Sequence, residues 1–217
     1  MSELLTPAQV AREGLTDWRW VDDALRTRYL TGDFRRGMML LRQIAEEAEQ
    51  LDHHPDVDLR YPHLDLALSS HDVGGVTARD VRLARLVSEH ARALGVEAAP
   101  ARVQVLEVAL DTADADEIRP FWLSVLGYER DAGDETELVD PAGRQPTLWL
   151  QGTDPHEEPR QRFHLDLMVP ADVVRERMAR ALAAGGTLVT DEFAPQWWVL
   201  ADPQGNKVCL CAVDETG

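Results

Sequence analysis

Residues 52–80 hold the side chains of this chain that are best suited to acid–base chemistry. The stretch contains the doublet His53-His54, then His71 and, at its end, Asp80. An imidazole titrates near neutral pH, so one histidine can take up a proton while another releases one. These residue types therefore indicate a reaction in which protons are moved between atoms of a bound substrate.

The elements around this stretch are expected to bring these side chains together. Apolar residues at steps of four and three predict an amphipathic helix, which Pro55 prevents from continuing. Its expected apolar face consists of Phe34, Met38, Leu41, Ala45 and Ala48. Alternating leucines predict a half-buried strand over 59–69, and Thr77 with Asp80 predicts the start of a helix over 78–94. The doublet then follows a helix, the third histidine follows a strand, and such element ends can share one cleft.

The remaining N-terminal residues predict a small α+β unit. Two short strands, 18–21 and 24–30, are expected on either side of a turn at 22–23. Together with the strand and helices above, they predict a small antiparallel sheet with helices on one face. Residues 95–102 are small and lack periodicity, so they are the expected linker between a domain at 1–96 and a second at 103–217.

The first domain closely resembles the pterin-4a-carbinolamine dehydratase family. The resemblance lies in Ala-Glu-Gln-Leu-Asp-His-His-Pro at 48–55, Leu-Ser-Ser-His-Asp at 68–72 and Thr-Ala-Arg-Asp at 77–80, with Tyr61 and the glycine pair 74–75 between them. It covers roughly residues 4 to 95. Two departures are visible: Val57 stands where the family usually has an aromatic residue, and Tyr-Leu-Thr at 29–31 replaces its Phe-x-Phe.

This resemblance implies a dehydratase that eliminates water from a 4a-hydroxytetrahydropterin, such as 4a-hydroxytetrahydrobiopterin, to give the quinonoid dihydropterin. It implies that His53, His54 and His71 share the acid and base roles, with the assignment between them left open, and that Asp80 orients a histidine or holds the pterin. Asp80 is equally explained as part of a helix cap. The residues implied to bind substrate are Asp56, Tyr61, Ser70 and Asp72.

The same resemblance implies a homo-oligomer that needs no cofactor and is linked to aromatic amino acid hydroxylases. Two alternatives stay open. One is a module that binds a pterin or another heteroaromatic compound without turnover, and the other is a protein-interaction module.

The second half contains a weak internal repeat. Each copy is expected to have a strand, a helix that stops at glycine, and an Asp-Pro-x-Gly turn, at 140–143 and again at 202–205. The first strands are expected at 103–110 and 163–169. This order resembles the glyoxalase/bleomycin-resistance (vicinal oxygen chelate) superfamily, which implies a pair of βαβββ motifs around a small-molecule cleft.

That superfamily often places metal ligands on the first and last strands of each copy. The matching positions are Glu107, Gln151, His164 and Cys209. Because an amide and a thiol replace the usual ligands, a metal-free site is expected, with metal near His164 left open. Adjacent rings at the histidine doublet cannot easily face one ion, so no metal is expected there either. Trp149, Trp197 and Trp198 could stack on a flat ligand, but core packing is the favoured interpretation.

Composition limits the possible binding partners and the cellular location of the protein. A net charge of −17 argues against nucleic acid as a partner, because phosphate binding needs clustered basic residues. The sequence has no apolar run of the length a membrane helix needs and no secretory signal at its start, so a cytoplasmic location is expected. Cys209 and Cys211, two apart on one expected strand, are poorly placed for a disulfide and should be reduced.

Overall fold

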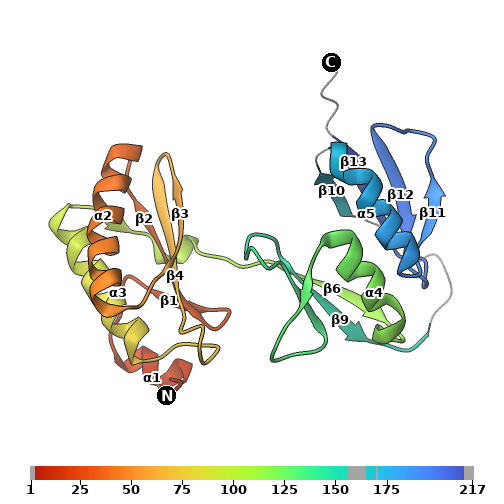
Figure 1. Cartoon of the computed structure of the whole chain (residues 1–217). Coiled ribbons are helices and arrows are strands. Elements are labelled where there is room, and N and C mark those ends of the chain that lie inside the picture. The colour runs from red at the N-terminus through yellow and green to blue at the C-terminus, as the bar shows by residue number, and fades with distance from the viewer. Residues whose placement is uncertain (1–2, 156–164, 170, 213–217) are drawn as a thin grey trace. The chain divides into compact units, whose positions relative to one another are not determined.

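The computed structural model describes residues 3–155, 165–169 and 171–212 (Figure 1). The chain divides into two compact units, Met1–Val105 and Leu106–Gly217. Each unit combines helices with antiparallel or mixed sheet, so the predicted α+β class is confirmed. Among the described residues, no helix is long and apolar enough to cross a membrane.

The first unit is built on an antiparallel sheet with the strand order β1-β2-β4-β3. Its strands are β1 (Arg19–Val21), β2 (Ala24–Leu30), β3 (Asp56–Arg60) and β4 (His63–Leu68), with the short β5 (Glu97–Ala98) paired to β2. The predicted turn between β1 and β2 is present. Both of its residues, Asp22 and Asp23, have positive φ, as a tight hairpin of this kind requires.

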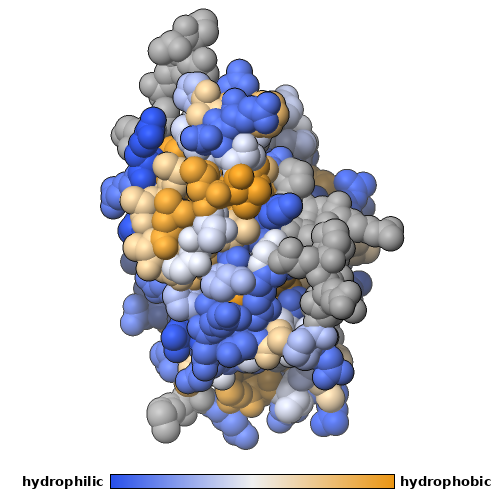
Figure 2. All heavy atoms as spheres, turned by 90° about the vertical axis from the view of Figure 1, so that its right-hand side faces the viewer, coloured by the Kyte–Doolittle hydropathy of each residue, from blue (hydrophilic) through white to orange (hydrophobic). Residues whose placement is uncertain are grey.

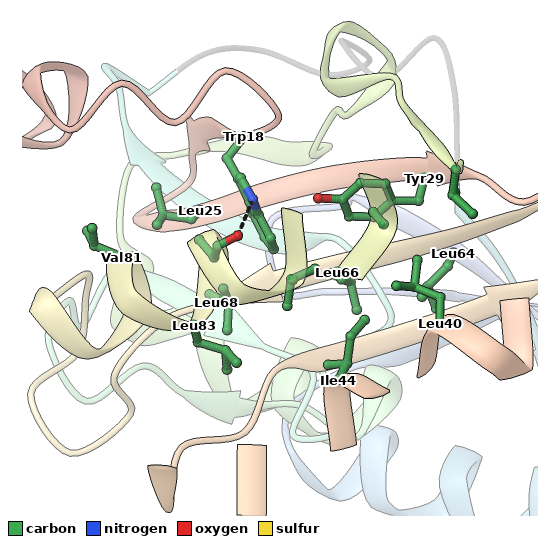
Figure 3. Packing of buried hydrophobic residues seen from close by; sticks show 14 of the residues in the cluster. Trp18, Leu25, Tyr29, Leu40, Ile44, Leu64, Leu66, Leu68, Val81 and Leu83 are labelled. Atoms are coloured by element: carbon green, nitrogen blue, oxygen red, sulfur yellow. Dashed lines mark hydrogen bonds between the residues drawn. The ribbon is translucent and has the colours of Figure 1, made fainter. Parts of the chain in front are cut away.

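Two long helices pack on one face of this sheet (Figure 1). They are α2 (Phe34–Leu51) and α3 (Ala78–Ala93); the short α1 (Pro7–Arg12) precedes β1. The predicted face of α3 is confirmed, since Leu83, Val87 and Ala91 are buried. Trp18 lies in the same core, where its Nε1 donates to the carbonyl of Ala84 at 3.1 Å (Figure 3).

The predicted apolar face of α2 is confirmed for Leu41 and Ala48 and wrong for Phe34, Met38 and Ala45. The buried residues are Gly37, Leu40, Ile44 and Ala48, whereas Phe34, Met38 and Met39 are about half exposed. The helix carries two neighbouring apolar stripes, and the stripe with small and branched residues packs onto the sheet. A Cβ at Gly37 would lie 2.5 Å from Leu59, which shows how closely this stripe approaches β3.

Two other boundaries differ from the expectations. The single strand expected over 59–69 is a hairpin, because Tyr61 and Pro62 form the turn between β3 and β4. Residues 95–102 are not a free linker, since β5 pairs with β2 and the 3₁₀ helix η1 (Pro100–Arg102) follows it. Part of the expected linker, Glu97–Ala98, therefore belongs to the first sheet.

The second unit consists of two motifs with the same βαβββ order. The first contains β6 (Glu107–Thr112), α4 (Ala115–Leu126), β7 (Glu129–Arg130), β8 (Glu137–Val139) and β9 (Thr147–Gly152). The second contains β10 (Leu165–Val169), α5 (Ala171–Ala183), β11 (Thr187–Thr190), β12 (Trp197–Ala201) and β13 (Lys207–Ala212). Their sheet orders, β6-β9-β8-β7 and β10-β13-β12-β11, correspond strand for strand, so the expected duplication is confirmed.

The motifs share one core, in which α4 packs against α5. The repeated turn is tied to this core in the second motif: Asp202 is buried, and its Oδ2 accepts the Nε1–H of Trp122 on α4 at 3.0 Å. The surface in Figure 2 is mostly hydrophilic but carries an apolar patch. Exposed apolar residues of the second motif include Leu188, Val189 and Phe193.

Candidate active site

The end of α2 places the histidine doublet. Asp52 caps the helix in the left-handed conformation, with φ 48° and ψ 44°, and turns the chain back. The backbone N–H of His53 then donates to the carbonyl of Ala48 at 3.1 Å, which holds this residue against the last turn of the helix. As a result His53 is only 6% exposed, whereas the next residue, His54, points to solvent.

A tight loop after β4 places the third histidine. The N–H of Ser70 donates to the carbonyl of Gly75 at 2.8 Å, and its own carbonyl accepts from Val73 at 3.0 Å. Gly74 adopts a positive φ of 68°, which a residue with a side chain rarely adopts. The loop leaves His71 exposed at its tip.

The first turn of α3 supplies the carboxylate. Thr77 caps the helix, and the backbone N–H of Thr77 donates to Oδ2 of Asp80 at 2.7 Å. The predicted capping box is therefore present. Asp80 itself is 0% exposed.

One buried network joins these three segments. Nε2 of His53 lies 2.7 Å from Oδ1 of Asp80. On the other side of the carboxylate, the hydroxyl of Ser70 donates to Oδ2 at 2.7 Å and also lies 2.8 Å from the hydroxyl of Thr77. The helix cap and the hydrogen bond to His53 thus use different oxygens of one carboxylate, so the two interpretations of Asp80 are compatible.

Polar groups at the surface surround this network. Oε1 of Glu49 lies 3.3 Å from Nε2 of His54. The exposed Asp72 pairs with Arg79, and this hydrogen bond lowers the pKa of Asp72. The carboxylate of Asp72 therefore stays ionised at neutral pH.

Not every residue expected to bind substrate lies in this cluster. Asp56 starts β3 close to the doublet, opposite Ala67. Tyr61, in contrast, is 69% exposed in the turn at the far end of the hairpin. At about 3.3 Å per strand residue, Tyr61 lies about 15 Å along the hairpin from the start of β3, where the histidine doublet is. Within a single chain, Tyr61 is therefore not part of the cluster. Ser70 is 1% exposed and faces Asp80, behind the histidines.

Two polar partners were not singled out from the sequence. Glu49 and Arg79 both lie within the motifs that carry the resemblance, but a charge beside a helix end is usually a solvated surface group. No helical spacing indicates the contact of Glu49, because its partner His54 lies beyond the left-handed cap that ends α2.

The second unit shows another arrangement of the residues considered for metal binding. Glu107 and Gln151 are exposed, and His164 lies outside the described residues. Cys209 is buried beside Asp166 on the neighbouring strand; burial, followed by the hydrogen bond to Asp166, raises its pKa to about 11. Within the described ranges, no three His, Cys, Asp or Glu side chains converge as metal ligands would.

The three tryptophans of this unit differ in environment. Trp198 packs against Val174 in the core, as expected. Trp197 stacks on Phe193 with ring centroids 4.5 Å apart, and Trp149 is half-buried on β9. Both cysteines are free, in agreement with the expected thiols.

Comparison with known proteins assigns a family to each half. Residues 3–90 match the family described as pterin 4 alpha carbinolamine dehydratase, and residues 107–211 match a glyoxalase-like domain. A provisionally named pterin-4-alpha-carbinolamine dehydratase of Thermomicrobium roseum is 42% identical over 33% of this chain and 77% of its own length. A protein with the same provisional name from Nocardia farcinica is 38% identical over 42% of this chain and 98% of its own length.

Among solved structures, a transcriptional coactivator/pterin dehydratase from Brucella melitensis is 31% identical, with a TM-score of 0.40. The alignment covers 41% of this chain and 99% of that one. The matched sequences include the histidine doublet, the third histidine and the buried aspartate described above. The chain belongs, through its first unit, to the pterin-4a-carbinolamine dehydratase family, and it carries a glyoxalase-like domain as its second.

Proposed function

We propose that the first unit is a 4a-hydroxytetrahydrobiopterin dehydratase that acts through histidine acid–base catalysis. The observation that carries this proposal is the buried pair of His53 and Asp80, joined at 2.7 Å, with the exposed His54 and His71 on the adjoining segments. A family whose members are named for this dehydration supports the substrate class.

The reaction breaks the bond between C4a and its hydroxyl oxygen and removes a proton from a ring nitrogen, so that water and a quinonoid dihydropterin leave. A group that accepts the nitrogen proton and another that protonates the hydroxyl are sufficient, and no cofactor is required. Asp80 holds one ring nitrogen of His53, which suits this histidine to the role of base. The solvent-exposed His54 and His71 are suited to supply the proton to the departing hydroxyl.

Substrate binding is assigned to the polar rim of the cluster. Asp56 and Asp72 lie at the histidine end of the hairpin and loop, and carboxylates there can accept hydrogen bonds from the amino and ring N–H groups of a pterin. Aromatic amino acid hydroxylation is the class of reaction that would supply this substrate. A cytoplasmic location remains a prediction.

The test is the dehydration rate of freshly generated 4a-hydroxytetrahydropterin, followed by stopped flow. The full chain is expected to accelerate the reaction over buffer, and His53→Ala, His54→Ala and His71→Ala are each expected to lose about 10²- to 10⁴-fold of that acceleration. His63→Ala is a matched control, because His63 lies on the sheet 3.9 Å from Asp65 and outside the cluster. Equal losses in all four variants would contradict the assignment.

We also propose that the first unit assembles into a homo-oligomer. Phe34, Met38 and Met39 form an apolar strip on α2 that is about half exposed in the single chain. Burying such a strip against a second copy is favourable at about 25 cal/mol per Å² of apolar area.

For the second unit we propose a small-molecule binding role without a metal. Support comes from the sheet face turned away from the helices, where Trp197 and Cys209 alternate with core residues of β12 and β13. Isothermal titration of the full chain with candidate ligands, with and without added Zn²⁺, tests this role. Binding only in the presence of the metal would contradict it.

A further inference from the structure

We propose that Ser70 is a positioning residue of the reaction, because its hydroxyl fixes the charge of Asp80 and, through it, the tautomer of His53. The inference deepens the dehydratase function proposed above and rests on it. It departs from the expectation that Ser70 contacts the substrate.

Burial makes the hydrogen bonds of Asp80 decisive. The carboxylate is 0% exposed, and a carboxylate removed from water is costly unless donors replace the water. Three donors do so: Nε2 of His53 at Oδ1, and at Oδ2 the hydroxyl of Ser70 and the backbone N–H of Thr77. The hydroxyl of Thr77 lies farther from Oδ2, at 3.2 Å. Ser70 provides the shorter of the two hydroxyl contacts, at 2.7 Å.

Counting hydroxyl protons gives the network a direction. Each hydroxyl has one proton to donate. The hydroxyl of Thr77 accepts from the N–H of Arg79 at 3.2 Å, so its own proton is free to point to Ser70, 2.8 Å away. The proton of Ser70 then points to Asp80. This series of hydrogen bonds ends on Oδ2 of Asp80, which carries no hydrogen.

The direction of the network assigns the remaining hydrogen. Since the donors at Oδ2 stabilise an ionised Asp80, the hydrogen between Oδ1 and Nε2 belongs to the ring of His53. A neutral ring with its proton on Nε2 has a lone pair on Nδ1. Within the described residues only Nε2 of this ring has a hydrogen-bond partner, and the side chain is 7% exposed, so Nδ1 is the nitrogen that remains for the substrate. It can accept the proton of the pterin nitrogen.

The test begins with the ring nitrogens of His53 in the wild-type chain. ¹⁵N NMR correlations distinguish the two tautomers, and the spectrum of His53→Asn identifies the signals of this ring. The inference expects the Nε2–H form of the neutral ring. An Nδ1–H form in the wild type would overturn it without recourse to any variant of Ser70.

The second part compares Ser70→Ala with Ser70→Thr, which keeps the hydroxyl, and with Ser69→Ala at the neighbouring half-buried position. In Ser70→Ala, kcat should fall about 10- to 100-fold, the effect of losing one hydrogen bond to a charged group, while KM changes less than about threefold. The Nδ1–H form should become detectable, and Ser70→Thr should restore kcat and tautomer.

The outcomes separate this inference from the function on which it rests. A wild-type chain that does not accelerate dehydration refutes the proposed function, whatever the tautomer. An active wild type with a Ser70→Ala variant that is folded by circular dichroism and has unchanged kcat refutes the positioning role. A loss of kcat in Ser70→Ala without a change of tautomer also refutes it, because it shows a merely structural role.

Discussion

Replacing Asp80 by Asn tests the buried network with almost no change in side-chain shape. The carboxylate accepts from His53, from Ser70 and from the backbone of Thr77, each at 2.7 Å. An amide has one oxygen, so at least one of these donors must face the NH₂ group. Nε2 of the imidazole can adapt only by giving up its hydrogen, which moves the proton to Nδ1.

The expected loss of stability follows from these contacts. A hydrogen bond to a charged group contributes roughly 1.5–3 kcal/mol, against roughly 0.5–1.5 kcal/mol for a neutral one. Two weakened bonds and one mismatched donor are partly offset by removing the desolvation cost of the buried charge. We expect a destabilisation of the first unit by about 2–4 kcal/mol, and a fall in kcat of about 10²- to 10⁴-fold because the base is lost.

The assay must separate the two units, because unfolding of such a chain need not be a single transition. Urea unfolding followed by hydrogen-exchange mass spectrometry of α2 and α3 peptides reports on the first unit alone. Asp65→Asn is the matched control: this carboxylate pairs with Arg28 on the open face of the same sheet and is 30% exposed. It should cost no more than about 1 kcal/mol and leave the rate unchanged. An Asp80→Asn variant with a rate within threefold of wild type would refute the reasoning.

Three further predictions concern packing, thiols and assembly. Gly186→Ala should destabilise the second unit by about 1–3 kcal/mol in thermal unfolding, because a Cβ there would lie 2.3 Å from the Phe121 ring, whereas Gly152→Ala, with nothing within 4 Å, should not. Similar losses in both would contradict this packing. The raised pKa of Cys209, about 11 against its usual 9.0, means that the unfolded thiol ionises first, so stability should be constant below pH about 9 and fall as pH rises towards about 11. A C209S variant should show a smaller fall, because burial also raises the pKa of Cys211 and raises the pKa of Tyr128 to about 12. An identical alkaline profile would argue against an origin in the Cys209 thiol. Size-exclusion chromatography with light scattering should show an oligomer that Met38→Glu dissociates; a wild-type monomer would exclude assembly through α2.

Local sequence patterns predicted the elements of the fold better than their packing. The capping box at Thr77, the hairpin at Asp22-Asp23 and the repeated Asp-Pro-x-Gly turns depend on neighbours in sequence, and all are present. The apolar face of α2 was misassigned in part because two stripes satisfy the helical period, and the choice between them depends on how closely β3 approaches Gly37. Periodicity within one helix contains no information about that distance.

In the candidate site, too, the features set by local sequence were predicted and those set by tertiary contacts were not. Element ends correctly indicated that His53 and Asp80 meet, since both follow from where helices stop and start. The burial of Ser70 behind them, and the separation of Tyr61 at the hairpin tip, depend on a loop and a turn whose directions are set by tertiary contacts. A sequence motif identifies residues that act together, but it does not indicate which of them contact the substrate.

The most direct measurement is the decay of 4a-hydroxytetrahydropterin in the presence of the full chain, compared with a variant in which His53, His54 and His71 are all replaced by alanine. The account predicts that the wild type shortens the lifetime of the carbinolamine, and that the triple variant, folded by circular dichroism, returns it to the value in buffer. A wild-type chain that leaves the lifetime unchanged, or a triple variant that shortens it equally, would contradict the central claim.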